Sequence, residues 1–313
     1  MGVFLGFDTS NYTTSVAAAD ENGNIIANVK KLLPVKDGER GLRQSDAVFH
    51  HTNALPDILD EVKALIGGEK IIAVGASERP RDAVGSYMPC FLVGRAAAKS
   101  AALSAGVPYY DFSHQCGHVM AALYSAKKTE LVGQDFVAFH LSGGTTDILL
   151  VESDKERIIK ATRIGGTKDI NAGQAIDRAG VMAGLHFPCG AELEKYALAY
   201  DGQVKVKICV DGLDCNLSGG ENKAKELYEK SKSREAVAAT VFEYVSKTVK
   251  TLTENVLEKY PDIPIIYSGG VASSVILKNT LAEYGSFAEP KFSSDNAAGT
   301  ALLTAQKYRN NGL

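Results

Sequence analysis

The sequence lacks the glycine motifs of the two commonest nucleotide-binding folds. Neither GxxxxGK(S/T) nor GxGxxG occurs in it, which excludes a P-loop and a Rossmann dinucleotide site. It also has no CxxC pair, because its five cysteines, an odd number, are scattered along the chain. Scattered cysteines in a chain of this length are typical of reduced thiols in a cytoplasm rather than of a disulfide framework.

Charge of neither sign is in large excess. The chain has 34 lysines and arginines against 37 aspartates and glutamates, a net charge of -3 and a pI near 6.1. The field of the whole chain would therefore not attract nucleic acid, and any RNA contact is expected to be local or shared with a partner protein. The N-terminus has no basic stretch and reaches Asp8 before a long apolar run can form, which predicts no signal peptide, no membrane anchor and a cytoplasmic location.

What the sequence does have is enough apolar residues for a large core. Its 313 residues are 45% hydrophobic and 23% charged, without a low-complexity tract. This length exceeds the usual size of a single core, so we expect two lobes that share one cleft. We place an N-terminal lobe at residues 1–125, joined by a final helix at 296–313, and a C-terminal lobe at residues 126–295.

One pattern occurs three times: an apolar strand that runs into a turn of small and polar residues. VFLGFDTS ends in such a turn near the N-terminus, FHLSGGTTDILLVE repeats the order of strand, turn and strand, and IPIIYSGG ends a third strand. Backbone amides in glycine turns can approach phosphate closely. One Ser-Gly-Gly is more often an ordinary tight turn, but the three turns together favour phosphate binding. They predict an α/β fold of the two-lobed, actin-like ATPase (ASKHA) type, with duplicated lobes around a nucleotide cleft.

The segment DINAGQAIDRAGVMAGLHFPCGAELEKYA supplies candidates for the nucleoside side of such a cleft. Its helix start is rich in small residues, and Gly190 marks a turn. On an actin-like fold, Asp177 and Glu194 could accept hydrogen bonds from ribose hydroxyls. The alternative is that Asp177 only pairs with Arg178 or Lys195 at the surface.

His114 and His118 are candidate metal ligands. They are four residues apart where a strand is expected to give way to a helix, so both imidazoles can face one cation. An HxxxH pair is structural about as often, but Asp295, at the start of the last helix, would add a carboxylate. Two nitrogens and one oxygen suit iron, zinc or manganese better than magnesium alone, although magnesium could accompany a nucleotide. Cys116, between the histidines, is expected to be a buried thiol more readily than a ligand.

The same residues form an ordered set of short motifs. SHQCGHVMAAL contains HxxGH, LSGGTTDIL contains an SGG loop, DINAGQAIDR and PCGAELE follow, and SGGVASSVIL and Asp295-Asn296 come last. In this order and spacing they resemble the tRNA N6-adenosine threonylcarbamoyltransferase family over nearly the whole chain. The resemblance implies His114, His118 and Asp295 as metal ligands. The substrate or nucleotide contacts implied by the loops are Leu141, Ser142, Gly143, Gly144, Thr145, Asp177, Gly190, Glu194, Gly269, Gly270 and Ser274.

The resemblance also implies an activity. It is a metal-dependent acyltransferase reaction in which a threonylcarbamoyl group moves from its adenylate to N6 of an adenosine in tRNA. The implied cofactors are ATP or an acyl-adenylate and one divalent metal. The implied partners are tRNA, reached through a multi-protein complex, and the other subunits of the threonylcarbamoyl-transfer machinery.

The sequence departs from the family where the reaction would take place. The family's ETSxDET motif is DTSNYTT here, with Tyr12 and Thr13 in place of two carboxylates, which leaves Asp8, Thr9 and Thr13 as catalytic candidates. Cys116 stands in place of the acidic residue of HxEGH, and the family's Gly-Pro-Gly stretch has become ERPRDAVGSYMPCFLVG. A weakly basic aromatic amine needs a base or an oriented acceptor to react. Binding is therefore better supported by the sequence than turnover.

Three alternatives to this transfer stay open. The protein could be a carbamoyl or acyl transferase with another acceptor, or a non-catalytic paralogue that binds nucleotide. A sugar or acetate kinase would share the fold, but a fold is weak evidence for a substrate. A zinc peptidase is disfavoured, because HxxGH lacks the glutamate that activates water in HExxH.

Overall fold

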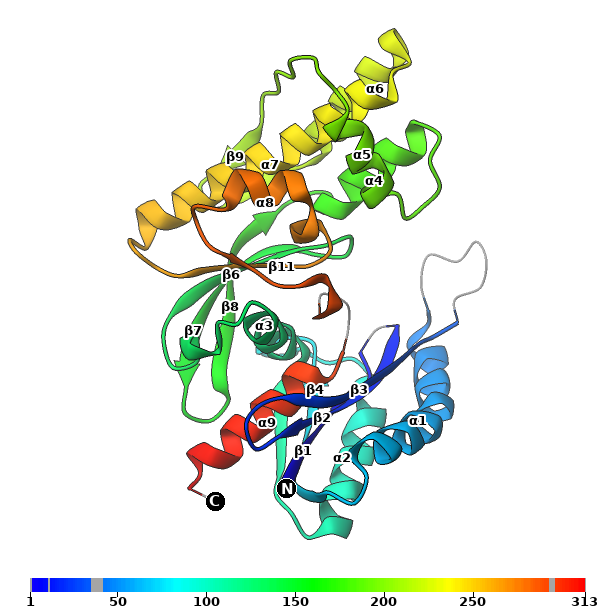
Figure 1. Ribbon diagram of the computed structural model, residues 1–313, viewed down its shortest axis with the longest axis vertical. Helices are drawn as coiled ribbons and strands as arrows, with labels where there is room; N and C mark the ends of the chain where they lie inside the picture. Colours follow the sequence, from blue (N-terminus) through cyan, green and yellow to red (C-terminus); the bar gives the residue numbers. More distant parts are fainter. Residues whose placement is uncertain (1, 11, 35–41, 293–295, 313) are drawn as a thin grey trace. The chain divides into compact units, whose positions relative to one another are not determined.

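The computed structural model describes residues 2–10, 12–34, 42–292 and 296–312 (Figure 1). The chain forms two compact units. The first consists of Met1–Gln134, Glu152–Ala161 and Lys291–Leu313, and the second of Asp135–Val151 and Thr162–Pro290. The lobe boundaries that we expected from the sequence stay a prediction.

The first unit is built on a five-stranded sheet with the order β3-β2-β1-β4-β5. Its strands are β1 (Gly2–Asp8), β2 (Thr13–Asp20), β3 (Ile25–Leu32), β4 (Lys70–Arg79) and β5 (Tyr109–Ser113). β1, β2 and β3 are antiparallel neighbours, whereas β4 is parallel to β1 and β5 is parallel to β4. β1 and β2 are buried along their whole length, which explains their nearly continuous apolar sequence.

Helices pack on both faces of this sheet (Figure 1). The helical segments of the unit are α1 (Gln44–Ile66), α2 (Phe91–Ala105), α3 (His114–Ser125), η1 (Thr129–Leu131) and α9 (Ala298–Asn310), with η3 (Pro290–Phe292) before α9. Leu5 and Phe7 of β1 share a core with α1 and α2, while Phe4 shares one with α9. The alternation of β1 side chains thus divides the helices between the two faces. α1 begins at Gln44, before the segment TNALPDILDEVKALI, in which the apolar residues have helical spacing.

Glycines set how closely α9 approaches its neighbours. A Cβ atom on Gly6 of β1 would lie 2.3 Å from the backbone nitrogen of Ala301. A Cβ atom on Gly299 of α9 would lie 1.8 Å from the backbone oxygen of Gly117 in α3. α3 and α9 therefore cross with their backbones in contact, and this crossing requires glycine at position 299.

The second unit is built on a seven-stranded sheet with the order β12-β11-β6-β7-β8-β10-β9. Its strands are β6 (Phe136–Leu141), β7 (Thr146–Asp154), β8 (Ile158–Thr167), β9 (Cys209–Asp211), β10 (Asp214–Asn216), β11 (Ile265–Ser268) and β12 (Ser286–Phe287). Residues 152–154 of β7 and 158–161 of β8 belong to the first unit. β6 and β7 are antiparallel and β11 is parallel to β6, as β1, β2 and β4 are in the first unit. This repeated arrangement was expected from the repeated strand-turn-strand pattern.

One core joins this sheet to its helices. They are α4 (Ala172–Met182), α5 (Gly190–Leu198), α6 (Ser218–Ser231), α7 (Arg234–Lys259), α8 (Val275–Leu281) and the short η2 (Val271–Ser273). α7 packs against α4, α5, α6 and α8 and supplies many of the core side chains. Within the described residues, no helix has both the length and the apolar character that crossing a membrane requires.

Asp169 connects the loop before α4 to the start of α6. Its carboxylate accepts hydrogen bonds from the backbone nitrogens of Ile170 at 2.6 Å, Leu217 at 2.8 Å and Ser218 at 3.1 Å. Burial by itself raises the pKa of Asp169, but the hydrogen bonds from Ser218, Leu217 and Ile170 outweigh it and hold this pKa well below 3.8. The charged form of Asp169 therefore stabilises the folded state.

We expect Gly299→Ala to destabilise the first unit by about 1–3 kcal/mol, because the added methyl group overpacks the crossing of α3 and α9. Helix propensity alone would favour the alanine by about 1 kcal/mol. Urea unfolding measures the free energy of unfolding. Gly68→Ala is the matched control, since apart from its chain neighbours no atom in the described part of the chain lies within 4 Å of its added Cβ. Equal stabilities of the two variants would contradict the close crossing.

We expect Asp169→Asn to lower the stability at pH 7 and to weaken its pH dependence. The pKa of Asp169 is depressed in the folded state, so its contribution is present above about pH 4 and is lost as the pH falls through the folded-state value. Thermal unfolding between about pH 2 and pH 7 checks this. Asp201→Asn, at an exposed position of the same unit, is the control. Parallel pH profiles of Asp169→Asn and the wild type would refute the assignment.

Candidate functional site

His114 and His118 lie on one side of the first turns of α3. β5 ends at Ser113 and α3 begins at His114, so the histidines occupy the strand-to-helix junction that we predicted. Their Nε2 atoms are 2.9 Å apart, and their ring centroids are 4.3 Å apart. The spacing of four residues brings both rings over the same part of the helix. The two imidazoles thus converge on one point, as shared metal ligands do.

Asp8 orients the first of these histidines. It ends β1, its side chain is 1% exposed, and its Oδ2 lies 2.8 Å from Nδ1 of His114. Burial alone raises the pKa of Asp8, but the charge and hydrogen bond of His114 and the hydrogen bonds of Ser10 and Ser77 lower it. A carboxylate at Nδ1 holds the proton on that nitrogen and leaves Nε2 to act as an acceptor or ligand. The sequence suggested Asp8 as a catalytic candidate and did not suggest this orienting contact.

The residues present fit a metal ion in part. Two imidazole nitrogens converge, and a buried carboxylate supports one of them from behind. Within the described residues, which do not include the predicted ligand Asp295, no group of three or more histidine, cysteine, aspartate or glutamate side chains has the geometry to hold a metal. Of the three predicted ligands, the structure thus brings His114 and His118 together, whereas Asp295 lies outside the described residues.

Cys116 faces away from the two histidines. Its thiol donates to Oδ2 of Asp82 at 3.1 Å and to the backbone oxygen of Ile159 at 3.5 Å. Burial and the charge of Asp82 raise the pKa of Cys116 to about 12. A metal-ligating cysteine is a thiolate, so this side chain has the character of the buried thiol that we expected.

The other two catalytic candidates lie next to Asp8. The hydroxyl of Thr9 donates to the backbone oxygen of Cys90 at 2.9 Å and accepts from the backbone nitrogen of Gly94 at 3.0 Å. Thr9 therefore joins the end of β1 to the start of α2. Thr13 is buried at the start of β2, and its nitrogen donates to the oxygen of Ser10 at 3.1 Å. The catalytic roles of Asp8, Thr9 and Thr13 stay predictions.

The second unit contains a cavity of about 370 Å³ in the region where we predicted nucleotide contacts. It lies among the starts of α4 and α5, the 142–145 loop and the 270–274 loop. Its lining includes the predicted residues Gly143, Asp177, Gly190, Glu194, Gly270 and Ser274. It also includes residues that we did not predict, which are Gly173, Ile176, Pro188, Ala191, Phe242, Val271 and Ser273.

The remaining predicted contacts shape the loops beside this cavity. Leu141 is 1% exposed in the core, and Ser142 accepts hydrogen bonds from the nitrogens of Gly144 and Thr145 at 3.3 and 3.0 Å. Gly269 has a φ of 93°, and a Cβ atom on it would lie 2.2 Å from the oxygen of Leu141. The end of β11 can therefore approach β6 only with glycine at this position.

The two acidic residues of the cavity also make structural contacts. Asp177 accepts a hydrogen bond from the nitrogen of Cys189 at 2.9 Å, while Arg178 pairs with Glu221 at 3.1 Å, so the alternative pairing of Asp177 with Arg178 is not observed. Oε1 of Glu194 accepts from the nitrogen of Ile276 at 3.0 Å and from the hydroxyl of Ser274. Both carboxylates therefore hold the cavity wall together.

Ser273 and Gly173 are the most informative of the unpredicted residues. The buried hydroxyl of Ser273 lacks a hydrogen-bond partner within the described part of the chain, although it lines the cavity. Such a group is satisfied when a polar ligand binds. A Cβ atom on Gly173 would lie 2.7 Å from Cα of Gly143, so α4 can approach the 142–145 loop only through glycine. Small residues at the start of α4 were the available signal for this contact.

Comparison with known proteins identifies relatives in sequence and in fold. A family model described as tRNA N6-adenosine threonylcarbamoyltransferase matches residues 24–302. A curated relative of the same name from Streptococcus pneumoniae (strain Taiwan19F-14) is 30% identical over 293 residues, covering 89% of this chain and 82% of its own length.

Two solved structures share the fold at low sequence identity. A ROK family glucokinase from Streptomyces griseus has a TM-score of 0.55 at 13% identity, covering 97% of this chain and 100% of its own. Component A of (R)-2-hydroxyglutaryl-CoA dehydratase from Acidaminococcus fermentans has a TM-score of 0.54 at 13% identity, covering 99% and 100%. These neighbours confirm the predicted actin-like ATPase fold. The match of the family model over most of the sequence shows that the chain belongs to the tRNA N6-adenosine threonylcarbamoyltransferase family.

Proposed function

We propose that the protein transfers a threonylcarbamoyl group from an acyl-adenylate to N6 of an adenosine in tRNA, with one divalent metal bound to His114 and His118. The observation that carries the proposal is the convergence of the two Nε2 atoms, 2.9 Å apart and supported by Asp8, in a chain of this family. Asp295 is the proposed third ligand. The proposed compartment is the cytoplasm.

The cavity of the second unit is the proposed site for ATP or the acyl-adenylate. Glycines at positions 143, 173 and 270 let backbone amides come close to a ligand. Asp177 and Glu194 present carboxylate oxygens that suit ribose hydroxyls, and the hydroxyl of Ser273 can satisfy its hydrogen-bonding capacity on the ligand. These features support a nucleoside phosphate better than an apolar ligand.

The proposed metal is iron, zinc or manganese, because two neutral imidazoles and one carboxylate suit these ions. When bound, such an ion neutralises developing charge and polarises an oxygen of the reacting group. The contribution of the protein is to keep Nδ1 of His114 protonated and its ring in place through Asp8. Ser113, whose hydroxyl accepts from the nitrogen of Cys116 at 3.3 Å, fixes the helix start that carries the pair.

The N-terminal segment DTSNYTT favours a second candidate function, that of a transferase with another acceptor. Tyr12 and Thr13 stand where the family has two carboxylates, and Tyr12 is 41% exposed. In the sequence of residues 8–14, DTSNYTT, Asp8 has no second acid beside it that could take the proton that N6 loses. For tRNA as acceptor, we therefore propose that partner proteins dock the RNA and complete the site, which agrees with the net charge of -3.

The direct test supplies the chain with partner subunits, threonylcarbamoyl-adenylate and unmodified tRNA, and measures threonylcarbamoyladenosine by mass spectrometry. We expect product with the wild type and none with His114→Ala. No product from the wild type, while a standard family member is active in the same assay, would refute the proposed acceptor. Consumption of the adenylate without tRNA would favour another acceptor, and binding without consumption would favour a non-catalytic paralogue.

We expect Gly270→Leu to weaken nucleotide binding by at least about tenfold without unfolding the protein. The side chain would occupy the cavity, since no atom of the described residues, apart from the chain neighbours, lies within 4 Å of a Cβ at this position, and its φ of −59° suits any residue. Calorimetric titration with a non-hydrolysable ATP analogue measures the affinity. Gly68→Leu, at an exposed glycine outside the cavity, is the control. An unchanged affinity in Gly270→Leu would place the nucleotide elsewhere.

We expect Asp8→Asn to weaken Co²⁺ binding by about 10–100-fold, because the variant removes the charge that supports Nδ1 of His114. Titration against a competing chelator measures the affinity. Asp57→Asn, which removes an exposed ion pair with Lys31, should bind Co²⁺ as the wild type does. Wild-type affinity in Asp8→Asn would contradict the orienting role of Asp8.

A further inference from the structure

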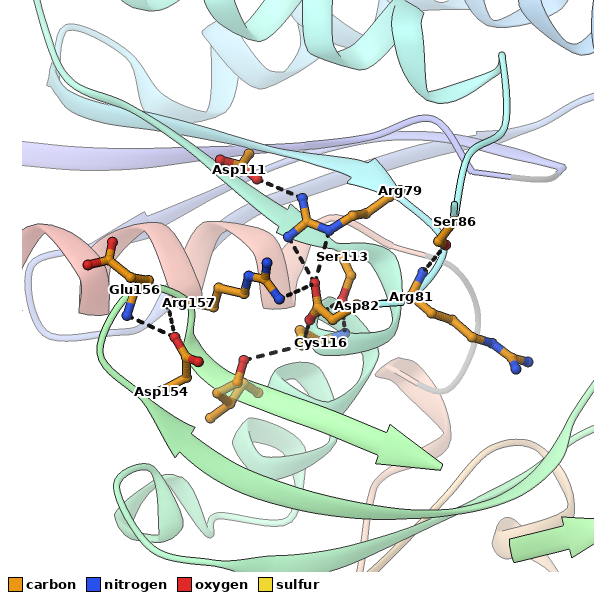
Figure 2. A network of polar contacts seen from close by, with 11 residues as sticks. Arg79, Arg81, Asp82, Ser86, Asp111, Ser113, Cys116, Asp154, Glu156 and Arg157 are labelled. Carbon is orange, nitrogen blue, oxygen red and sulfur yellow. Dashed lines mark hydrogen bonds and ion pairs between the residues drawn. The ribbon is translucent and has the colours of Figure 1, made fainter. Parts of the chain in front are cut away.

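Asp82 is a buried carboxylate at the centre of a polar network in the first unit (Figure 2). It lies in the loop that follows β4, within the stretch ERPRDAVGSYMPCFLVG, and its side chain is 1% exposed. Asp82 and its partners Arg79, Ser113, Cys116 and Arg157 all belong to the first unit. A buried charge of this kind needs several donors around it to be stable.

The two oxygens of Asp82 serve different partners. Oδ1 accepts a hydrogen bond from Nε of Arg79 at 2.9 Å and forms ion pairs with Nη2 of Arg79 at 2.8 Å and Nη1 of Arg157 at 3.5 Å. Oδ2 accepts from the hydroxyl of Ser113 at 3.0 Å and from the thiol of Cys116 at 3.1 Å. Oδ1 is thus neutralised by arginines, whereas Oδ2 holds the start of α3 (Figure 2).

The contacts at Oδ2 fix the first turn of α3. The hydroxyl of Ser113 donates to Asp82 and accepts from the nitrogen of Cys116, so the carboxylate sets the direction of the hydroxyl that caps the helix. Cys116 is two residues from each histidine, which places it about 200° around the helix from both. Asp82 therefore holds α3 from the side opposite to the His114–His118 pair.

We propose that Asp82 is a positioning residue for His114 and His118, and that it sets the affinity of the chain for a divalent metal through Ser113 and Cys116. The inference rests on the proposed metal site. It assigns a function to a residue that touches neither histidine. It also connects two departures from the family. Asp82 lies in the loop that replaces the family's Gly-Pro-Gly stretch, and it contacts Cys116, which replaces an acidic residue on α3.

Asp82→Asn is a sharp test because all of the partners described for Asp82 are donors. An asparagine offers one acceptor oxygen and one donor nitrogen, so its nitrogen must face either the arginines or the pair Ser113 and Cys116. The matched control is Asp111→Asn. Asp111 also pairs with Arg79, at 2.6 Å, but its side chain is 53% exposed and its described contacts are with Arg79 rather than α3.

The measurement is the affinity of the full chain for Co²⁺ alone, together with the visible absorption of the bound ion, which reports ligand geometry. We expect Asp82→Asn to bind about tenfold more weakly and with an altered spectrum. Asp111→Asn should match the wild type in both. Wild-type affinity and spectrum in Asp82→Asn would overturn the inference while leaving the metal site in place.

Two further experimental results would also decide whether the inference is correct. If Asp82→Asn does not fold, Ser113→Ala removes one contact at Oδ2 and leaves the arginines paired. Weaker Co²⁺ binding by that variant supports the inference, and unchanged binding overturns it. If the wild type itself does not bind Co²⁺, the proposed metal site is wrong and the inference with it.

Discussion

The hydrogen bond between Asp8 and His114 is the contact on which the candidate metal site depends. It joins residues 106 positions apart and connects the end of β1 to the start of α3. Both groups are largely withdrawn from water, with side-chain exposures of 1% and 12%, so the interaction is only weakly screened. It keeps Asp8 ionised and holds one imidazole in a defined orientation. A carboxylate near the N-terminus therefore orients a histidine on another element.

Glycine contacts place the elements of both candidate sites. In the first unit, Gly299 lets α9 cross α3 at Gly117 with the backbones in contact, and this crossing fixes the helix that carries the histidines. In the second unit, Gly173 lets α4 approach the loop between β6 and β7 at Gly143. A Cβ atom on Gly173 or on Gly299 would lie within 3 Å of backbone atoms, so packing alone already requires the absence of a side chain at these two positions.

Two departures from the family, Cys116 and the loop that contains Asp82, lie in contact in the first unit. Cys116 and the loop that contains Asp82 are far apart in the sequence, yet the thiol and the carboxylate are in contact. A second carboxylate at position 116 would meet the charge of Asp82 at close range, which is unfavourable in a buried environment. The cysteine is thus compatible with the rewritten loop, and the two changes are best understood together.

Local sequence determined the elements and the family of this protein. The strands at Gly2–Asp8, Phe136–Leu141 and Ile265–Ser268 follow from apolar runs that end in small residues, and the end of α2 at Gly106, with φ of 65°, follows from glycine's tolerance of the left-handed conformation. The HxxxH spacing predicted that the two histidines face one point, because four residues make about one helical turn. These features depend on neighbours within a few positions, so a sequence is sufficient to predict them.

Only the tertiary structure decided which distant residues meet at the candidate sites. The orienting contact of Asp8, the ion pair of Arg178 with Glu221, the hydroxyl of Ser273 in the cavity and the network of Asp82 join separate elements. None of them has a periodic or local signal, since each depends on how helices and loops pack on their own sheet. The pair His114 and His118 was therefore foreseeable from sequence, whereas the residues that hold it in place were not, because packing brings them together.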